Sequence, residues 1–325
     1  MTDIDLQLDS LNNRAVIYDR SDIGRIRAVG SDVLDLLNRL STNEVKYLPD
    51  NGGIPTVLTN EKGRIIDLII ILDVGEYKLL MTGNGRVEIV KEWIEKYTFV
   101  EESYLEDITR ETFLASILGP KASEVIQDVF KVDCSQMELY QSVKIPLNSL
   151  DIQVVRTDPL KDEGFDIFAP INLKEYVWDV FLDVGVVKLE RKCFDRQRIL
   201  RGIPVSGKEL TEEHNPLEAG LTKCINFSKG CYIGQEVVAR LDTYDKLKMN
   251  LVALQSPADT ALTDGDTLRF SGKQVGHVTS VVSDASFNLG LAYVRRIASK
   301  PGSLLSTLDD DRNVVEVLSI VDMFG

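Results

Sequence analysis

The sequence predicts an α+β protein that ends in a small antiparallel β-barrel or sandwich. Along the first two thirds of the chain, strand patterns and helix patterns alternate in the order typical of an α+β sandwich. After Asn250 the pattern changes to short apolar strands separated by turn residues, which indicates a barrel or a sandwich. A length of 325 residues adds the expectation of two or three domains.

The N-terminal part combines amphipathic helices with strands. Apolar residues at helical spacing predict a helix over residues 31–40, with Ser31 or Asp32 as its cap. Apolar and β-branched runs broken by Gly, Asn and Asp predict strands, and stripes of apolar residues predict further helices. The expected strands are residues 55–59, 64–72, 77–81 and 112–118, and the expected helices are residues 86–97 and 120–130.

The second half begins with a hairpin and ends in the strand-rich region. Residues 152–156 and 165–168 are expected to pair across a polar turn, whereas residues 202–215 have the Gly, Pro and charge content of a loop. Helices are expected over residues 173–184, 193–201 and 235–241. The C-terminal strands are expected at residues 251–255, 267–270, 274–283, 289–294 and 314–321.

The net charge of the chain argues against nucleic acids as direct partners. The chain has 37 basic and 51 acidic side chains and a formal net charge of -14. Because nucleic-acid affinity depends mainly on cations that neutralise phosphates, direct nucleic-acid binding is not expected. A basic run within residues 188–201 is interpreted as the solvated face of a helix.

The sequence indicates neither a membrane protein nor a secreted one. No apolar run approaches the roughly 20 residues that cross a bilayer. The first ten residues carry acids where a signal or transit peptide carries basic residues. We therefore expect a cytoplasmic protein, or the mature form of a protein of an organelle matrix or stroma.

The cysteines indicate free thiols. They form no C-x-x-C pair, and only His214 and His277 are available as imidazole ligands, so no permanent metal centre is predicted. A chain of this size has no need of a disulfide scaffold. The four cysteines are Cys134, Cys193, Cys224 and Cys231.

The octapeptide KGCYIGQE at residues 229–236 places a thiol beside a cation and between two glycines. We expect it at a strand-to-helix junction, with Cys231 near a helix N-terminus and Lys229 close by, a setting that raises the thiolate fraction of a cysteine. Gly230 and Gly234 allow the backbone to approach a ligand or to adopt positive φ. The alternative is that the glycines only make a turn and that Cys231 is an ordinary buried thiol.

The octapeptide matches the signature K-G-C-[FY]-x-G-Q-E, and the chain therefore resembles the YgfZ-type folate-binding proteins. These relatives of the glycine-cleavage T-protein, an aminomethyltransferase, act in iron–sulfur cluster assembly or repair. The resemblance covers nearly the whole chain. It extends to GSDVLDLLNRLSTNEV (residues 30–45), TNEKGRIIDLII (59–70), GKELTEEHNPLEAGL (207–221) and VVAR (237–240).

The resemblance implies a T-protein-like ring of three domains around a central channel that holds tetrahydrofolate, with the β-barrel at the C-terminus. A self-contained ring of this kind is expected to be a monomer. The implied division is a split first domain that carries the octapeptide, a ferredoxin-like α+β domain and a barrel domain. These cover residues 1–50 with 145–247, residues 51–144, and residues 248–325.

The resemblance also assigns site residues. Asp67 falls where the T-protein has the acid that contacts the reacting end of folate, where a carboxylate can orient N5 or N10 or accept a proton. The alternative for Asp67 is a polar residue on the exposed face of a strand. The implied catalytic residues are Cys231, Lys229 and Asp67, and the implied folate contacts are Asp67, Gly230, Tyr232, Gly234, Gln235 and Glu236.

One position departs from the family pattern. T-proteins carry an R-x-E-x-G element whose acid binds the pterin, but Leu200 stands at the acid's place, and a leucine cannot accept hydrogen bonds. Another acid can take over this role, or pterin binding is weaker or reoriented. The acids near Leu200 in the sequence are Glu209, Glu212, Glu213 and Glu218. Lys246 and Lys248 are either surface lysines or partners of a glutamate tail.

Three functions follow from the resemblance. The leading hypothesis is a tetrahydrofolate-binding accessory protein for the assembly or repair of iron–sulfur clusters in enzymes, because the T-protein lacks an element that matches the one around Cys231. Whether tRNA-modifying enzymes are among these enzymes stays open. The second is a folate-dependent aminomethyl or methyl transferase that uses Asp67. The third is a scaffold of the same fold that binds no folate, which the leucine at position 200 favours.

Overall fold

The computed structural model describes residues 3–147, 150–284, 286–307 and 314–324. The chain forms two compact units. The first consists of residues 1–56 and 69–194, and the second of residues 57–68 and 195–325. The outer ends of the predicted first and third domains, residues 1–2 and 325, lie outside the described residues. The finer division into three domains stays a prediction.

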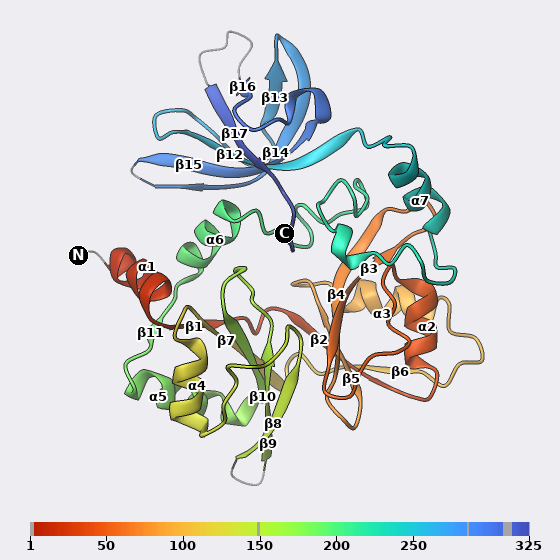
Figure 1. Ribbon diagram of the computed structural model, residues 1–325, viewed down its shortest axis with the longest axis vertical. Coiled ribbons are helices and arrows are strands. Elements are labelled where there is room, and N and C mark those ends of the chain that lie inside the picture. Colours follow the sequence, from red (N-terminus) through yellow and green to blue (C-terminus); the bar gives the residue numbers. More distant parts are fainter. Residues whose placement is uncertain (1–2, 148–149, 285, 308–313, 325) are drawn as a thin grey trace. The chain divides into compact units, whose positions relative to one another are not determined.

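A six-stranded sheet organises much of the first unit, in the order β11-β1-β7-β10-β9-β8 (Figure 1). All neighbouring strands are antiparallel except the parallel pair β1 and β11. The strands are β1 (Val16–Asp19), β7 (Thr112–Leu118), β8 (Ser142–Leu147), β9 (Leu150–Arg156), β10 (Gly164–Pro170) and β11 (Val187–Lys188). The pairing of β9 with β10 confirms the predicted hairpin.

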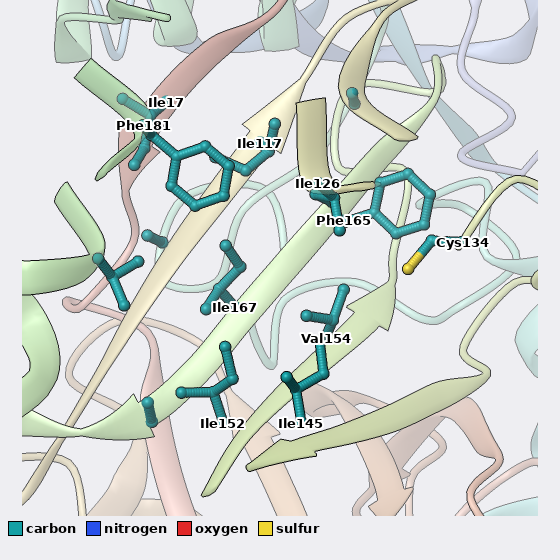
Figure 2. Packing of buried hydrophobic residues seen from close by; sticks show 14 of the residues in the cluster. Ile17, Ile117, Ile126, Cys134, Ile145, Ile152, Val154, Phe165, Ile167 and Phe181 are labelled. Carbon is teal, nitrogen blue, oxygen red and sulfur yellow. The ribbon is translucent and has the colours of Figure 1, made fainter. Parts of the chain in front are cut away.

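Alternate residues of this sheet build the core of the first unit. Ile117 on β7, Ile167 on β10 and Val154 on β9 point into one cluster, since side chains alternate between the faces of a strand (Figure 2). Helices α4 (Ala122–Phe130) and α5 (Lys174–Asp183) add their apolar stripes to the same cluster. Cys134 is buried there, and burial raises its pKa to about 11, so this thiol is inert at neutral pH.

A second sheet has the order β3-β4-β5-β2-β6. Its strands are β2 (Gly24–Val29), β3 (Gly53–Thr59), β4 (Ile65–Asp73), β5 (Lys78–Thr82) and β6 (Tyr104–Asp107), and its helices are α2 (Val33–Leu40) and α3 (Val87–Glu95). The end of β3 and the start of β4 belong to the second unit. The turn between these two strands is therefore part of the unit that contains the octapeptide.

The second unit contains a closed six-stranded barrel in the order β12-β15-β14-β13-β16-β17 (Figure 1). The strands are β12 (Met249–Pro257), β13 (Thr267–Phe270), β14 (Lys273–Ser283), β15 (Phe287–Arg295), β16 (Leu304–Ser306) and β17 (Val314–Ile320). The structure thus confirms the predicted α+β class and decides between a barrel and a sandwich in favour of the barrel.

Strands β12 and β15 are buried on both faces. Val252, Leu254 and Val294 belong to the cluster inside the barrel, and the intervening Leu251 and Tyr293 belong to a second cluster. That second cluster also includes Ile65 at the start of β4 and apolar residues of the segment from residue 199 to residue 224. The outer face of β12 and β15 is therefore the platform on which the loop segments of the family blocks pack.

Most predicted helices and strands are present within one to three residues of their expected ends. The remaining helices are α1 (Asp3–Asn13), α6 (Arg191–Leu200) and α7 (Gln235–Thr243). The elements that the sequence patterns did not predict are α1, β1, β2, β6, β8, β11 and β16. Two of these strands have only two or three residues, and β6 is largely exposed at a sheet edge, so none of the three carries a strong alternating apolar pattern.

One local prediction was wrong. The octapeptide does not follow a strand: it is preceded by the 3-10 turn Thr222–Cys224 and a loop, and only the helix after it, α7, is present as expected. Among the described residues, no helix is long and apolar enough to cross a bilayer.

Candidate functional site

Two of the family blocks are packed against each other by their backbones. The turn at residues 60–64 joins β3 to β4, and Gly234 of the octapeptide lies directly against it. A Cβ on Gly234 would lie 2.5 Å from the carbonyl oxygen of Asn60 and 2.9 Å from Cα of Gly63. Thr59 Oγ1 also donates a hydrogen bond of 2.6 Å to the carbonyl of Ile233. Gly234 therefore has a structural role, because no side chain fits at this contact.

The backbone conformation reinforces the same requirement. Gly234 has φ of +84° and Gly63 has φ of +66°, values that favour glycine. Gly234 is also the N-cap of α7, and it begins the helix without a side-chain hydrogen bond. Gly230 differs, since a Cβ there would meet nothing within 4 Å. Only the second glycine of the octapeptide is fixed by packing.

Within the octapeptide, Lys229 and Tyr232 are buried together. The Nζ atom of Lys229 lies 5.5 Å from the centre of the Tyr232 ring, a cation–π geometry. Burial raises the pKa of Tyr232 to about 12, so its hydroxyl stays protonated at physiological pH. Gln235 is half-buried and Glu236 is exposed, both in the first turn of α7. The buried contact between Lys229 and Tyr232 thus stabilises the loop.

Cys231 faces solvent. It is the one exposed cysteine of the four, all of which are described, and it follows Gly230, which is also exposed. The alternative of an ordinary buried thiol is therefore wrong for Cys231. Cys224, by contrast, is fully buried and has its pKa raised by burial. An exposed thiol in a loop fixed on both sides can be reached by a ligand or a partner.

Asp67 is completely buried on β4, three residues after the turn. The hydroxyl of Ser206, in the loop that follows α6, donates a hydrogen bond to Oδ1 of Asp67. The alternative of a polar residue on the exposed face of a strand is therefore wrong. A carboxylate held in a protein interior is costly unless it is hydrogen-bonded or used. Ser206 directly precedes the family block at residues 207–221 and was not singled out by the sequence.

The acids near Leu200 have different environments. Glu209 is fully buried and accepts hydrogen bonds from Thr279 at 2.8 Å and Ser280 at 2.6 Å, as well as from the Val205 backbone at 3.0 Å. The oxygen that accepts from Val205, Oε2, also lies 3.7 Å from Nη1 of Arg198. This carboxylate is engaged within the protein and is not available to a pterin.

Leu200 and the other three acids differ in their exposure to solvent. Leu200 ends α6 with 42% of its side chain exposed, so the leucine is not required by the core. Glu212 and Glu213 are exposed, and Glu218 is buried with its pKa raised by burial. Glu218 accepts hydrogen bonds from the backbone of Asn215, Met249 and Lys248.

Both histidines of the chain meet on the outer face of the barrel, which the sequence did not predict. His214 is buried and stacks on Tyr293 of β15, with ring centres 3.3 Å apart, and His277 of β14 lies 5.9 Å from His214. Burial and the neighbouring His277 and Arg64 lower the pKa of His214 to about 3. The two histidines are far apart in the sequence, so no motif could have revealed their contact.

Glu213, His214 and His277 offer ligand atoms that all lie within 4.8 Å of one another. Two imidazoles and a carboxylate are a donor set that divalent transition metals accept. However, Arg64 lies close enough to lower the pKa of His214, and a guanidinium at this position also repels a dication. The Arg64 guanidinium therefore opposes a metal ion at this group.

Comparisons with known proteins find similarity to the GCVT N-terminal domain and to aminomethyltransferases. Residues 4–229 match the model of the GCVT N-terminal domain. A putative chloroplastic transferase of Arabidopsis thaliana is 30% identical over 96% of this chain and 72% of its own length. An aminomethyltransferase of Caldanaerobacter subterraneus subsp. tengcongensis is 28% identical over 88% of this chain and 78% of its own.

A solved structure gives the same result for the fold. The crystal structure of the glycine cleavage system aminomethyltransferase T from Bartonella henselae aligns with a TM-score of 0.84 at 20% identity, over 98% of this chain and 90% of that one. The α+β architecture with its C-terminal barrel is therefore the architecture of that aminomethyltransferase.

We predict that Gly234→Ala destabilises the protein whereas Gly230→Ala does not. The first change forces a Cβ against the Asn60 carbonyl at positive φ, and we expect the free energy of unfolding to fall by about 2–4 kcal/mol. The second adds a methyl group to open space and should stay within about 0.5 kcal/mol of the wild type. Urea unfolding measures both, and equal losses in the two variants would show that the close contact does not matter.

We predict that His214 makes stability fall as the pH is lowered from about 6.5 toward about 3. In this window the unfolded chain binds a proton at His214 and the folded chain does not. One pH unit corresponds to about 1.4 kcal/mol, so between pH 7 and pH 5 this group alone lowers the free energy of unfolding by about 2 kcal/mol.

The matched control for this prediction is His214→Phe, which keeps a ring against Tyr293 and removes the titrating group. Urea unfolding of both proteins at pH 7 and pH 5 should show a smaller decrease in the variant. An identical decrease in both proteins would mean that His214 is not the titrating group.

Proposed function

Because the chain belongs to the family of the GCVT N-terminal domain, we propose that it binds tetrahydrofolate and acts as a folate-dependent aminomethyl or methyl transferase. The observation that carries this proposal is the complete burial of Asp67 on β4. The resemblance to the T-protein assigns to this position the acid at the reacting end of folate. The aminomethyltransferases among the relatives and the shared fold support the same activity.

The chemistry proposed for Asp67 is the binding and orientation of an amine. Ser206 donates to Oδ1 and fixes the carboxylate, which can accept up to about four hydrogen bonds in all. A buried carboxylate that accepts a hydrogen bond from N5 or N10 holds the amine in a defined orientation. It also favours positive charge that develops on the nitrogen during transfer, and it can accept the proton that is released.

The pterin ring is the part of folate for which the family acid is missing. Leu200 supplies no acceptor, and Glu209 is occupied by its own donors. We propose that the pterin is held mainly through contacts other than this acid, with the octapeptide residues Gly230, Tyr232, Gly234, Gln235 and Glu236 as the family-implied contacts. Weaker pterin recognition than in the aminomethyltransferases is the expected consequence.

A second candidate function is carried by a different observation, the exposure of Cys231. We propose it as an accessory role in the assembly or repair of iron–sulfur enzymes, tRNA-modifying enzymes among the possible clients. A thiolate can ligate iron transiently or exchange with a cluster-bearing partner, and an aminomethyl transfer needs neither. In this role the cation–π contact between Lys229 and Tyr232 stabilises the loop that presents the thiol.

Neither proposed function determines the cellular compartment in which the protein works. The name of the Arabidopsis relative places that protein in the chloroplast. We propose an organelle interior or the cytoplasm as the working compartment, and the chloroplastic relative favours the first of these.

Calorimetric titration with tetrahydrofolate tests the transferase proposal. We expect the wild type to bind one equivalent, and Asp67→Asn to bind about 10-fold to 100-fold more weakly, because a hydrogen bond to a charged group contributes about 1.5–3 kcal/mol. Asp242→Asn, an exposed acid on α7, is the matched control and should bind like the wild type. Incubation with an aminomethyl or methyl donor should then yield methylene- or methyl-folate.

The outcomes of this titration distinguish the transferase, the accessory protein and the scaffold. Binding without turnover would contradict the transferase and leave the accessory role. No binding by the folded wild type would contradict both folate readings and support a scaffold that has kept the fold without the ligand.

Complementation tests the second candidate. In cells that lack this protein, we expect Cys231→Ser to fail to restore iron–sulfur enzyme activity, because the hydroxyl of serine neither ligates iron well nor exchanges with disulfides. Ser228→Ala, an exposed change in the same loop, should restore activity, and Cys231→Ser should still bind tetrahydrofolate. Full restoration by Cys231→Ser would remove the role of the thiol.

A further inference from the structure

A second polar site lies in the same unit, at the end of the barrel where β12 begins and β15 ends. It is a cavity of about 590 Å³. Its lining contains four basic and two acidic side chains in a chain whose net charge is -14. The lining residues are Arg64, Glu213, His214, Glu218, Lys248, Met249, Arg295, Arg296 and Ile297.

The register of the barrel brings three of these cations together. Met249 of β12 is paired with Arg295 of β15, and the backbone N–H of Arg296 donates to the carbonyl of Lys248 at 3.2 Å. Lys248 and Arg296 therefore flank the Met249–Arg295 pair, although they are far apart in the sequence. This gathering is fixed by strand pairing and does not depend on flexible loops.

The fourth cation and the buried acid Glu218 are already satisfied within the protein, whereas the carboxylate of Glu213 is exposed and lines the same cavity. Arg64 donates to the backbone carbonyl of Glu213 at 2.7 Å and lies 3.5 Å from the carboxylate of Glu218. Glu218 also accepts hydrogen bonds from three backbone N–H groups. Its negative charge is thus compensated and does little to neutralise the remaining cations.

Two of the cations have no ion-pair partner among the described residues. Arg296 pairs with Asp245 at 2.6 Å, whereas no carboxylate within the described part of the chain pairs with Lys248 or Arg295. Both side chains are exposed and line the same cavity. Two neighbouring cations that pair with no acid among the described residues are available for a ligand.

We propose that this cavity binds a small organic or inorganic dianion, with Lys248 and Arg295 as its charged contacts and Arg64 and Arg296 at its borders. Arginine suits two oxygens of one carboxylate or phosphate, and lysine binds a further oxygen as a point charge. Met249 and Ile297 offer apolar surface to the body of the ligand. The site is distinct from Asp67, which is buried on Ser206.

Paired anionic oxygens can come from a phosphate compound or from a chain of carboxylates, so two probes are needed. Calorimetry with inorganic pyrophosphate and with tri-L-glutamate should show saturable one-to-one binding of at least one of them to the full chain. Lys248→Gln and Arg295→Gln should each weaken that binding about tenfold, which corresponds to about 1.4 kcal/mol. Lys300→Gln removes an exposed charge that does not line the cavity, and it should leave the affinity unchanged.

The result that overturns the proposal is the absence of binding of both probes to the folded wild type. A loss in Lys300→Gln as large as in the cavity variants would also overturn it, since it would indicate general attraction of anions. Competition identifies the source of the ligand: displacement of the probe by triglutamyl but not monoglutamyl tetrahydrofolate assigns the site to a folate tail. If the probe stays bound in the presence of triglutamyl tetrahydrofolate, the site is assigned to a separate dianion. Because Asp67→Asn leaves the cavity intact, its effect on tetrahydrofolate is independent of probe binding.

Discussion

The close backbone approach between Gly234 and the turn at residues 60–64 is the constraint on which the candidate site depends. The space between Gly234 and the Asn60 carbonyl is too small for a Cβ, and both glycines at this contact have positive φ. The turn leads directly into β4 and hence to Asp67, while Gly234 leads into α7 and follows Cys231. One contact therefore fixes the strand that carries the buried acid and the loop that carries the exposed thiol.

The segments around this contact pack on the outer face of the barrel. Because β12 and β15 are apolar on both sides, the segment that follows α6 packs on them and brings Ser206 to Asp67 and Glu209 to Ser280. The same two strands place Lys248 beside Arg296. The buried acids are hydrogen-bonded, as charges in an interior must be, and the cations at the barrel end are left to solvent.

The sequence predicted the class of fold and most elements, because long alternating or helical apolar patterns identify strands and helices reliably. It could not predict the contacts between distant segments. The stacking of His214 on Tyr293 and the bond from Ser206 to Asp67 join residues more than 70 positions apart. Short strands such as β11 and β16 were missed for the same reason, since their pairing is decided by neighbours and not by their own residues.

For the candidate site, the motif drew attention to one loop but did not show what each residue in it does. The two glycines of KGCYIGQE look alike in the sequence, yet only Gly234 is needed for packing, and Gly230 stands in open space. The four acids considered as replacements for the residue at Leu200 also look alike, yet Glu209 and Glu218 are engaged by internal donors. Burial and hydrogen bonding separate these cases, and neither can be read from residue types.

The central claim is that the buried carboxylate on β4 faces bound folate. A crystal structure of the full chain grown with tetrahydrofolate under reducing conditions tests it most directly. We expect the reduced pterin and its N5 or N10 within hydrogen-bond distance of Asp67, with the octapeptide at its side. A folate bound elsewhere, with Asp67 still enclosed by protein atoms alone, would contradict the account.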